Sequence, residues 1–272
     1  MMEIENCEFN KLMYFIKSNY GINLEEKKVL LEGRLSNMIL ERGFESFEEY
    51  IRNVFMDNTG KEVKTLINKV TTNHTFFMRE PVHFEFLRST VLPYLENNIK
   101  DRDIRIWSAG CSSGEEAYTI AMIIDDYFGE KKYMWDTQIL ATDISENVLK
   151  KGTSGIFNEV SLINMPNSFK LKYFKKIDDE NYEIKQKLKN EVIFREFNLM
   201  EEKYPFKRNF DIIFCRNVMI YFDQDTKIDL VSKFYNSTKQ GGYLFIGHSE
   251  YINKEETKYK HIMPAVYRRV ET

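Results

Sequence analysis

Two glycines and two glutamates lie close together in the segment 104–116, which reads Ile-Arg-Ile-Trp-Ser-Ala-Gly-Cys-Ser-Ser-Gly-Glu-Glu. An apolar run ends in small residues, and a helix-like apolar pattern follows from Ala117. This order of strand, tight turn and helix is the one with which an open α/β sheet binds a nucleotide-like cofactor. The glycines allow a ligand to approach the backbone where a Cβ atom would clash.

The spacing of these glycines, Gly110-x-x-x-Gly114, differs from the G-x-G-x-x-G pattern of dinucleotide-binding folds. Glu115 and Glu116 follow at once. Acids at a helix N-terminus suit the helix dipole, but they would repel a phosphate. A cofactor with a cationic amino or sulfonium group, of which S-adenosyl-L-methionine is the common one, therefore fits better than NAD or ATP. The alternative is an ordinary turn followed by N-terminal helix acids.

Polar side chains also end the next two strands that we expect. Asp143 closes the second strand and could accept both ribose hydroxyls, unless it caps the helix that follows. Asn198 closes the third strand and could present its amide to an adenine edge, while Leu199 packs on the ring face. An asparagine at this place can also be a plain turn residue.

Arg216 and Asn217 interrupt an apolar run at the carboxyl end of the strand expected at 210–216. Polar residues at this point belong to the crevice side of such a sheet, where ligands bind. Tyr221 would lie near the same crevice, and the alternative for it is a half-buried core aromatic.

The segment 71–80, Thr-Thr-Asn-His-Thr-Phe-Phe-Met-Arg-Glu, lies between a helical region and the expected sheet. Junctions between domains are favoured binding sites, and Arg79 could hold a carboxylate in a bidentate pair. Composition alone favours an interdomain salt bridge beside two packed phenylalanines.

Composition excludes several classes of protein. The 272 residues are 43% hydrophobic and 30% charged with a net charge of -3, which argues against a nucleic-acid surface. No apolar run reaches the ~18 residues of a membrane span, and the acidic N-terminal residues are unlike a secretory signal. The three cysteines and four histidines lack disulfide or metal-ligand spacing. We expect a cytoplasmic protein without a metal.

The elements that must position these residues follow from hydrophobic periodicity. Residues 1–72 predict a helical domain in which Asn23 caps the second helix and Ser46 the third. Residues 73–272 predict a doubly wound, mostly parallel α/β sheet, with a linker at 73–102 and an inserted β-subdomain at about 155–191 that contains a hairpin. The expected strands are 104–109, 137–143, 191–197, 210–216, 242–247 and 264–270, and the expected helices are 114–128, 145–151 and 224–238.

Taken in order, these segments resemble the chemotaxis-receptor methyltransferases of the CheR type over nearly the whole chain. The matching pieces are Thr-Thr-Asn-His-Thr-Phe-Phe-Met-Arg-Glu (71–80), Trp-Ser-Ala-Gly-Cys-Ser-Ser-Gly-Glu-Glu (107–116), Ala-Thr-Asp-Ile-Ser (141–145), Phe-Asn-Leu (197–199), Ile-Phe-Cys-Arg-Asn-Val-Met-Ile-Tyr-Phe (213–222) and Gly-His-Ser-Glu (247–250).

The resemblance implies transfer of a methyl group from S-adenosyl-L-methionine to glutamate side chains of transmembrane chemoreceptors, with S-adenosyl-L-homocysteine as the product. It also implies that Arg79 and Tyr221 stand nearest the transferring methyl group and orient the acceptor. Glu116 would bind the cofactor's amino group or fix a residue that does. The residues implied at the cofactor are Asn73, Thr75, Arg79, Glu116, Asp143, Asn198, Leu199, Arg216 and Asn217.

Two departures from the family concern its partners. The expected hairpin turn at 177–181 contains no glycine, unlike that of members that dock on a receptor's C-terminal tail peptide, which argues against tail binding. The second helix carries less arginine than in known relatives, so Lys27, Lys28 and Arg34 remain to meet an acidic receptor helix. Two other functions stay open: methylation of a nucleic acid or small molecule, and a non-catalytic module that binds the cofactor.

Overall fold

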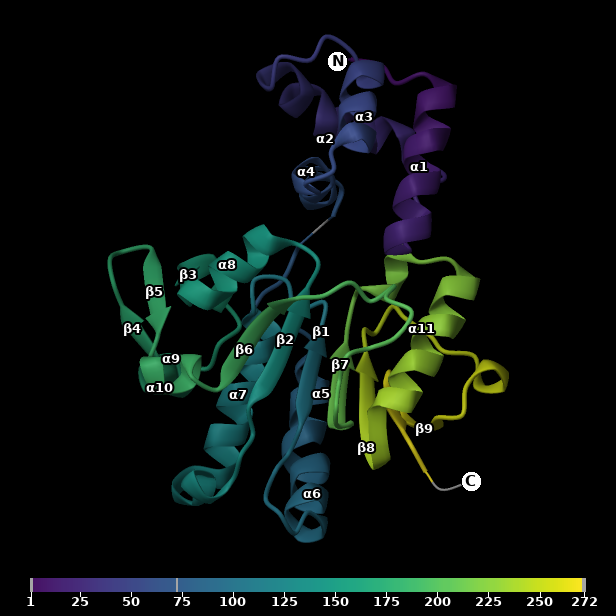
Figure 1. The fold of residues 1–272 in the computed structure, drawn as a ribbon. Coiled ribbons are helices and arrows are strands. Elements are labelled where there is room, and N and C mark those ends of the chain that lie inside the picture. The colour runs from purple at the N-terminus through teal and green to yellow at the C-terminus, as the bar shows by residue number, and fades with distance from the viewer. Residues whose placement is uncertain (1, 72, 271–272) are drawn as a thin grey trace.

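A computed structural model describes residues 2–71 and 73–270 (Figure 1). Its N-terminal part is a helical module of four helices whose apolar stripes face one another. Ser46 caps the third helix as predicted, because its side chain accepts a hydrogen bond from the backbone N–H of Glu49 at 3.1 Å. The helices are α1 (Asn6–Tyr20), α2 (Lys28–Glu41), α3 (Phe47–Met56) and α4 (Lys61–Val70).

The predicted cap at Asn23 is wrong. Helix α2 begins at Lys28, and the side chain of Asn23 instead accepts from the backbone N–H of Glu25 at 3.0 Å. Its own backbone N–H donates to the carbonyl oxygen of Tyr221 at 2.8 Å. Asn23, which the local sequence predicted as a helix cap, therefore forms a tertiary contact with the α/β part of the chain instead.

A seven-stranded sheet forms the centre of the α/β part, in the order β6-β2-β1-β7-β8-β10-β9. The first five strands in this order are parallel, and β10 runs antiparallel to both its neighbours. The predicted doubly wound fold is confirmed, and strand β9 was not predicted. The strands are β1 (Ile106–Ala109), β2 (Ile139–Asp143), β6 (Val192–Glu196), β7 (Phe210–Cys215), β8 (Thr238–Ile246), β9 (Lys260–Met263) and β10 (Val266–Arg268).

Successive side chains of a strand point to opposite faces, and the two cores follow this alternation. Ile106 belongs to the buried cluster that includes residues of α5, α6 and α7. Trp107 belongs to the other cluster, where it packs against Phe234 of α11. Residues 81–98, inside the expected linker, are helical, and Leu87 and Val91 are fully buried. The flanking helices are α5 (Pro81–Phe86), a π-helical turn (Leu87–Val91), α6 (Leu92–Asn98), α7 (Glu115–Phe128), α8 (Glu146–Ser154) and α11 (Gln224–Ser237).

A three-stranded antiparallel sheet, in the order β3-β5-β4, lies between β2 and β6 in the chain. The predicted hairpin is present, with Lys176 opposite Tyr182. Its turn is closed by Asp178, whose carboxylate accepts the backbone N–H groups of Glu180 and Asn181. The elements are β3 (Ile156–Asn158), α9 (Asn167–Tyr173), β4 (Phe174–Lys176), β5 (Asn181–Ile184) and α10 (Gln186–Lys189).

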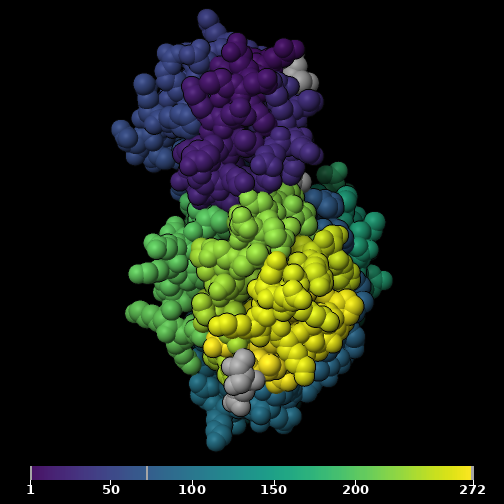
Figure 2. All heavy atoms as spheres, turned by 90° about the vertical axis from the view of Figure 1, so that its right-hand side faces the viewer, coloured from purple at the N-terminus to yellow at the C-terminus, as the bar shows by residue number. Residues whose placement is uncertain are grey.

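The helical module rests on the carboxyl-end side of the large sheet. Figure 2 shows the purple module against the light-green segment that contains β7 and α11. Ile22 forms an antiparallel bridge with Phe222, and Lys17 pairs with Asp223 at 2.7 Å. None of the helices in the described residues combines the length and apolarity that crossing a membrane requires.

Candidate functional site

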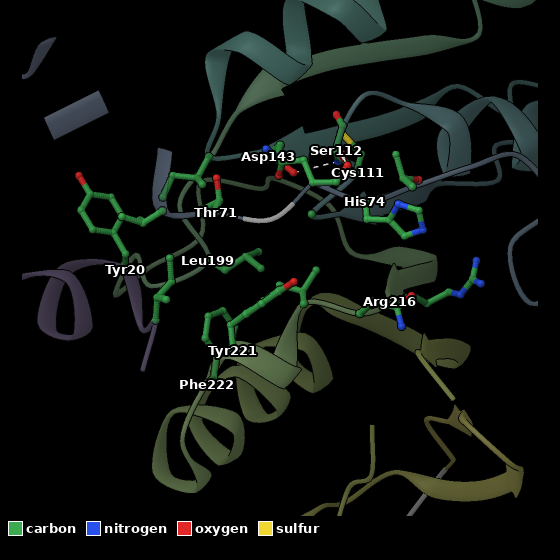
Figure 3. Close-up of a pocket in the computed structure, with 18 of the residues that line it drawn as sticks. Tyr20, Thr71, His74, Cys111, Ser112, Asp143, Leu199, Arg216, Tyr221 and Phe222 are labelled. Carbon is green, nitrogen blue, oxygen red and sulfur yellow. Dashed lines mark hydrogen bonds between the residues drawn. The ribbon is translucent and has the colours of Figure 1, made fainter. Parts of the chain in front are cut away.

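One pocket lies where the sheet order reverses, between β1 and β7. Strands β2 and β6 follow β1 in one direction and β8 follows β7 in the other, so the loops after β1 and β7 open a crevice at this edge. Figure 3 shows Asp143 and Ser112 across the pocket from Leu199 and Tyr221. All ten residues predicted for the site line this pocket: Asn73, Thr75, Arg79, Glu116, Asp143, Asn198, Leu199, Arg216, Asn217 and Tyr221.

The glycines of the turn after β1 are required by the backbone and by close packing. Gly110 and Gly114 have φ angles of +80° and +92°, in the left-handed region. A Cβ atom on Gly110 would meet the side chain of Val218, and one on Gly114 would lie 2.7 Å from Phe194. The turn is thereby held against the loop after β7 and against strand β6.

Asp143 joins the ends of two loops. One carboxylate oxygen accepts the backbone N–H of Ser112 at 2.8 Å (Figure 3). The other accepts that of Ser145 at 2.9 Å. Burial raises the pKa of the carboxyl, although these two N–H groups act in the opposite direction. Each oxygen keeps a second lone pair, so a fixed acceptor faces the pocket, as ribose hydroxyls require.

Arg216 is an almost fully buried cation between two carboxylates. Its guanidinium lies 3.2 Å from Glu116 and 3.2 Å from Glu80, and it also donates to the carbonyl oxygen of Arg79. The second oxygen of Glu116 accepts the hydroxyl of Ser108 at 2.7 Å. Burial raises the pKa of Glu116, and Arg216 and the hydroxyl of Ser108 act in the opposite direction. The contacts with Arg216 and Ser108 hold the Glu116 side chain in one orientation at the pocket.

Glu80 is a structural residue of the site that sequence reasoning missed. It has a φ of +58° and accepts from the side chain of Asn217 at 3.4 Å and the backbone N–H of His248 at 3.3 Å. Burial alone would raise its pKa, but Arg216 and His248 outweigh it, so the pKa of Glu80 is lowered. Glu80 follows Arg79 in the segment 71–80, but its contact with Arg216 forms only when the chain folds.

Glu250 is a second residue that the sequence did not assign. Its carboxylate accepts the backbone N–H groups of Asn217 at 3.0 Å, Gly247 at 2.5 Å and Ile220 at 3.2 Å. It therefore ties the loop after β7 to the end of β8. Asn217 has a φ of +59°, a conformation that this hydrogen bonding stabilises.

Arg79 forms no ion pair with any residue in 2–71 or 73–270, so the expected interdomain salt bridge is absent from the described chain. Its guanidinium donates to the carbonyl oxygen of His74 at 2.8 Å and lies 5.8 Å from the ring centre of Phe76. Of the two phenylalanines, Phe76 lines the pocket and Phe77 packs against Phe157 of the small sheet. Arg79 thus keeps donors for an anionic ligand.

The helical module closes one side of the pocket, which sequence reasoning did not foresee. The side-chain nitrogen of Asn198 donates to the carbonyl oxygen of Asn19 at 2.7 Å, which leaves one amide hydrogen for a ligand. Figure 3 shows Tyr20 at the end of the pocket opposite Arg216. The module residues in the lining are Tyr20, Ile22, Leu24, Lys27, Leu30, Arg34, Val70 and Thr71.

Comparisons with known proteins cover nearly the whole chain. Residues 73–267 match the CheR methyltransferase SAM-binding domain, and residues 8–71 match the CheR all-alpha domain. A chemotaxis protein methyltransferase of Borreliella burgdorferi is 45% identical over 98% of this chain and 96% of its own. That of Escherichia coli is 33% identical over 95% of this chain and 89% of its own. The chain therefore belongs to the CheR methyltransferase family, and S-adenosyl-L-methionine (SAM) is its cofactor.

Proposed function

We propose that this methyltransferase forms methyl esters on glutamate side chains of chemoreceptors. The observation that carries the proposal is one pocket lined by both Asp143, a fixed acceptor for ribose hydroxyls, and Arg79, a cation without an acidic partner in the described chain. The acceptors would be the cytoplasmic helices of the receptors, and the reaction would therefore take place in the cytoplasm.

The residues of the pocket fit the cofactor. Asp143 offers two oxygens to the ribose, while Asn198 and Leu199 offer an amide and an apolar face to the adenine. Arg79 can bind the carboxylate of the methionine part, and the carboxylate of Glu116 suits its amino group. Asn73 and Thr75 complete the lining on the same side as Arg79.

Bound SAM supplies a methyl group on a sulfonium centre that an oxygen nucleophile can attack. A glutamate carboxylate is ionised near neutral pH, so the chain needs no strong general base. Its residues must align the acceptor with the methyl carbon and remove part of the water around the carboxylate. Tyr221 can do this by donating a hydrogen bond to the acceptor, while Arg79 holds the methionine end of the cofactor beside it, and neither has to transfer a proton.

The test uses purified protein, methyl-labelled SAM and cytoplasmic fragments of the receptors of the source organism. We expect label on the receptor fragment that alkali releases as methanol, because carboxyl methyl esters hydrolyse in alkali. Alkali-stable label on RNA or DNA, or on no acceptor at all, would overturn the proposal. Calorimetry with S-adenosyl-L-homocysteine separates the outcomes, since a non-catalytic module would bind the product without turnover.

A further inference from the structure

The charged side chains that line the pocket are unequally paired. Among the described residues, the carboxylates of the lining are Asp143 and Glu116, and Arg216 is bound to Glu116 and to Glu80. Lys27 and Arg79 are lining cations that form no ion pair with any described residue of the chain. Two anionic groups can therefore bind in this pocket, each beside one of these two cations.

Lys27 stands on the side of the pocket formed by the helical module. It is the residue directly before α2, and its backbone is fixed because its carbonyl oxygen accepts from Leu31 at 3.0 Å. Its ammonium lies 5.4 Å from the ring centre of Tyr221. The backbone bond from Asn23 to Tyr221 connects the segment before Lys27 to the same tyrosine. Lys27 and Tyr221 are thus held together as a pair.

The proposed reaction brings two carboxylates into the pocket, one on the cofactor and one on the acceptor. Arg79 belongs to the segment after residue 72, where the backbone oxygen of Asn73 accepts from Ser112 of the turn after β1 at 3.3 Å. The methionine part of the cofactor is the part assigned to this side of the pocket. Lys27 enters from the opposite domain, beside the tyrosine assigned to the acceptor. The two cations therefore serve different carboxylates.

Leu30, one helical turn after Lys27, adds an apolar surface at the same place. It lines the pocket although 44% of it is exposed, whereas its neighbour Val29 is 74% exposed and is not part of the lining. A glutamate side chain has an apolar stem of two methylenes and an anionic end. Leu30 matches the apolar stem, and Lys27 matches the anionic end.

We infer that Lys27 binds the acceptor carboxylate and that Leu30 packs on its methylenes, so that α2 selects a glutamate as the methyl acceptor. This inference rests on the proposed function of the pocket. It assigns Lys27 a position at the reacting carboxylate, in addition to any general attraction between a basic helix and an acidic receptor.

The test compares Lys27→Gln with Lys28→Gln. The ammonium of Lys28 donates to the side chain of Asn6 at 2.8 Å and is not in the lining, so the two variants remove the same charge from adjacent positions. We expect Lys27→Gln to lower kcat/KM for a receptor fragment about 10- to 100-fold, in the range of a lost charged hydrogen bond. Lys28→Gln should lose about threefold or less, and added salt should remove that difference from wild type.

Binding of S-adenosyl-L-homocysteine distinguishes the acceptor from the cofactor. We expect its affinity for Lys27→Gln to stay within about twofold of wild type, and Lys27→Arg to regain most of the lost turnover. Equal losses in the two glutamine variants, or a loss of product binding in Lys27→Gln, would overturn the inference. Absence of methyl transfer by the wild-type protein would instead remove the proposed function.

A second pair of variants tests the apolar contact. Leu30→Ala should raise KM for the receptor fragment several-fold, whereas Val29→Ala should stay close to wild type because Val29 lies outside the lining. If both variants behave alike, Leu30 has no part in binding the acceptor. Thermal unfolding of each variant shows whether the fold is retained.

Discussion

Replacing Asp143 by asparagine changes one group in the pocket while keeping its shape. In the protein, each carboxylate oxygen accepts one backbone N–H, from Ser112 at 2.8 Å and from Ser145 at 2.9 Å. An asparagine has only one oxygen, so its amide nitrogen must face one of these two N–H groups. Asp143→Asn therefore leaves one backbone donor unpaired and removes the charge that we propose to face the cofactor's ribose.

The sizes of the two effects can be worked out separately. A buried donor without a partner costs about 1–3 kcal/mol of stability. Burial already raises the pKa of Asp143, so a neutral side chain avoids that cost of burying a charge and the net loss falls at the lower end. About 1 kcal/mol corresponds to a fall of about 2–4 °C in Tm. Loss of a charged hydrogen bond to the ribose, worth about 1.5–3 kcal/mol, raises Kd about 10- to 150-fold.

The assays are thermal unfolding without ligand and calorimetry with S-adenosyl-L-homocysteine. Asp178→Asn is the control for product binding, because Asp178 also accepts two backbone N–H groups, at 2.9 and 2.8 Å and both at one carboxylate oxygen, but lies in the hairpin turn outside the pocket. We expect it to bind the product like wild type. If Asp143→Asn binds the product within about threefold of wild type, the carboxylate does not hold the ribose and the reasoning is refuted.

Two further predictions concern the turn after β1 and the contact between module and sheet. Gly110→Ala should lower the free energy of unfolding in urea by about 1–3 kcal/mol more than Gly43→Ala does. Both glycines have φ near +80°, but only a Cβ atom at Gly110 would meet a side chain, that of Val218. Equal losses in the two variants would contradict this. The hydrogen bond from Lys17 lowers the pKa of Asp223 from its ordinary value to about 2. The stabilisation that this ion pair contributes is therefore fully present above the ordinary pKa and is lost as the pH falls through about 2. Solvent screens this partly exposed pair, so Asp223→Asn should cost about 1 kcal/mol or less at pH 7, as measured by urea unfolding. Most of that cost should be gone at about pH 2, and a pH-independent loss would exclude the ion pair.

The parts of the fold that were predicted correctly depend on local periodicity. The strands that end at Asp143 and Cys215 have alternating or continuous apolar patterns, whereas the polar turn residues around Asp178 indicated the hairpin. Strand β9 was missed because three of its four residues, Lys260, His261 and Ile262, are exposed and give no such pattern. The cap at Asn23 failed because a contact with Tyr221 outcompeted the local preference.

The site was predictable as far as it consists of residues at strand ends. Parallel strands bring their carboxyl ends to one edge, so Asp143, Asn198 and Arg216 had to meet once the strand assignment was right. The contributions of Lys27 and Leu30 could not be derived in this way. They depend on how the helical module sits on the sheet, and no periodicity encodes the bridge between Ile22 and Phe222 that fixes this arrangement.

The buried charges at the pocket floor explain why some residues of the site are hard to recognise. A buried ion pair recovers its desolvation cost only with good geometry, so Glu80, Glu116 and Arg216 together are weak stabilisers of the fold. Replacing them by apolar residues would leave the core intact, but it would remove the charged groups that we propose to meet the zwitterionic methionine part of the cofactor. Their value lies in preorganisation, because charges that are already oriented need not rearrange when the ligand binds. Glu80 contributes by holding Arg216 and Asn217 in place, a role visible only after the chain has folded.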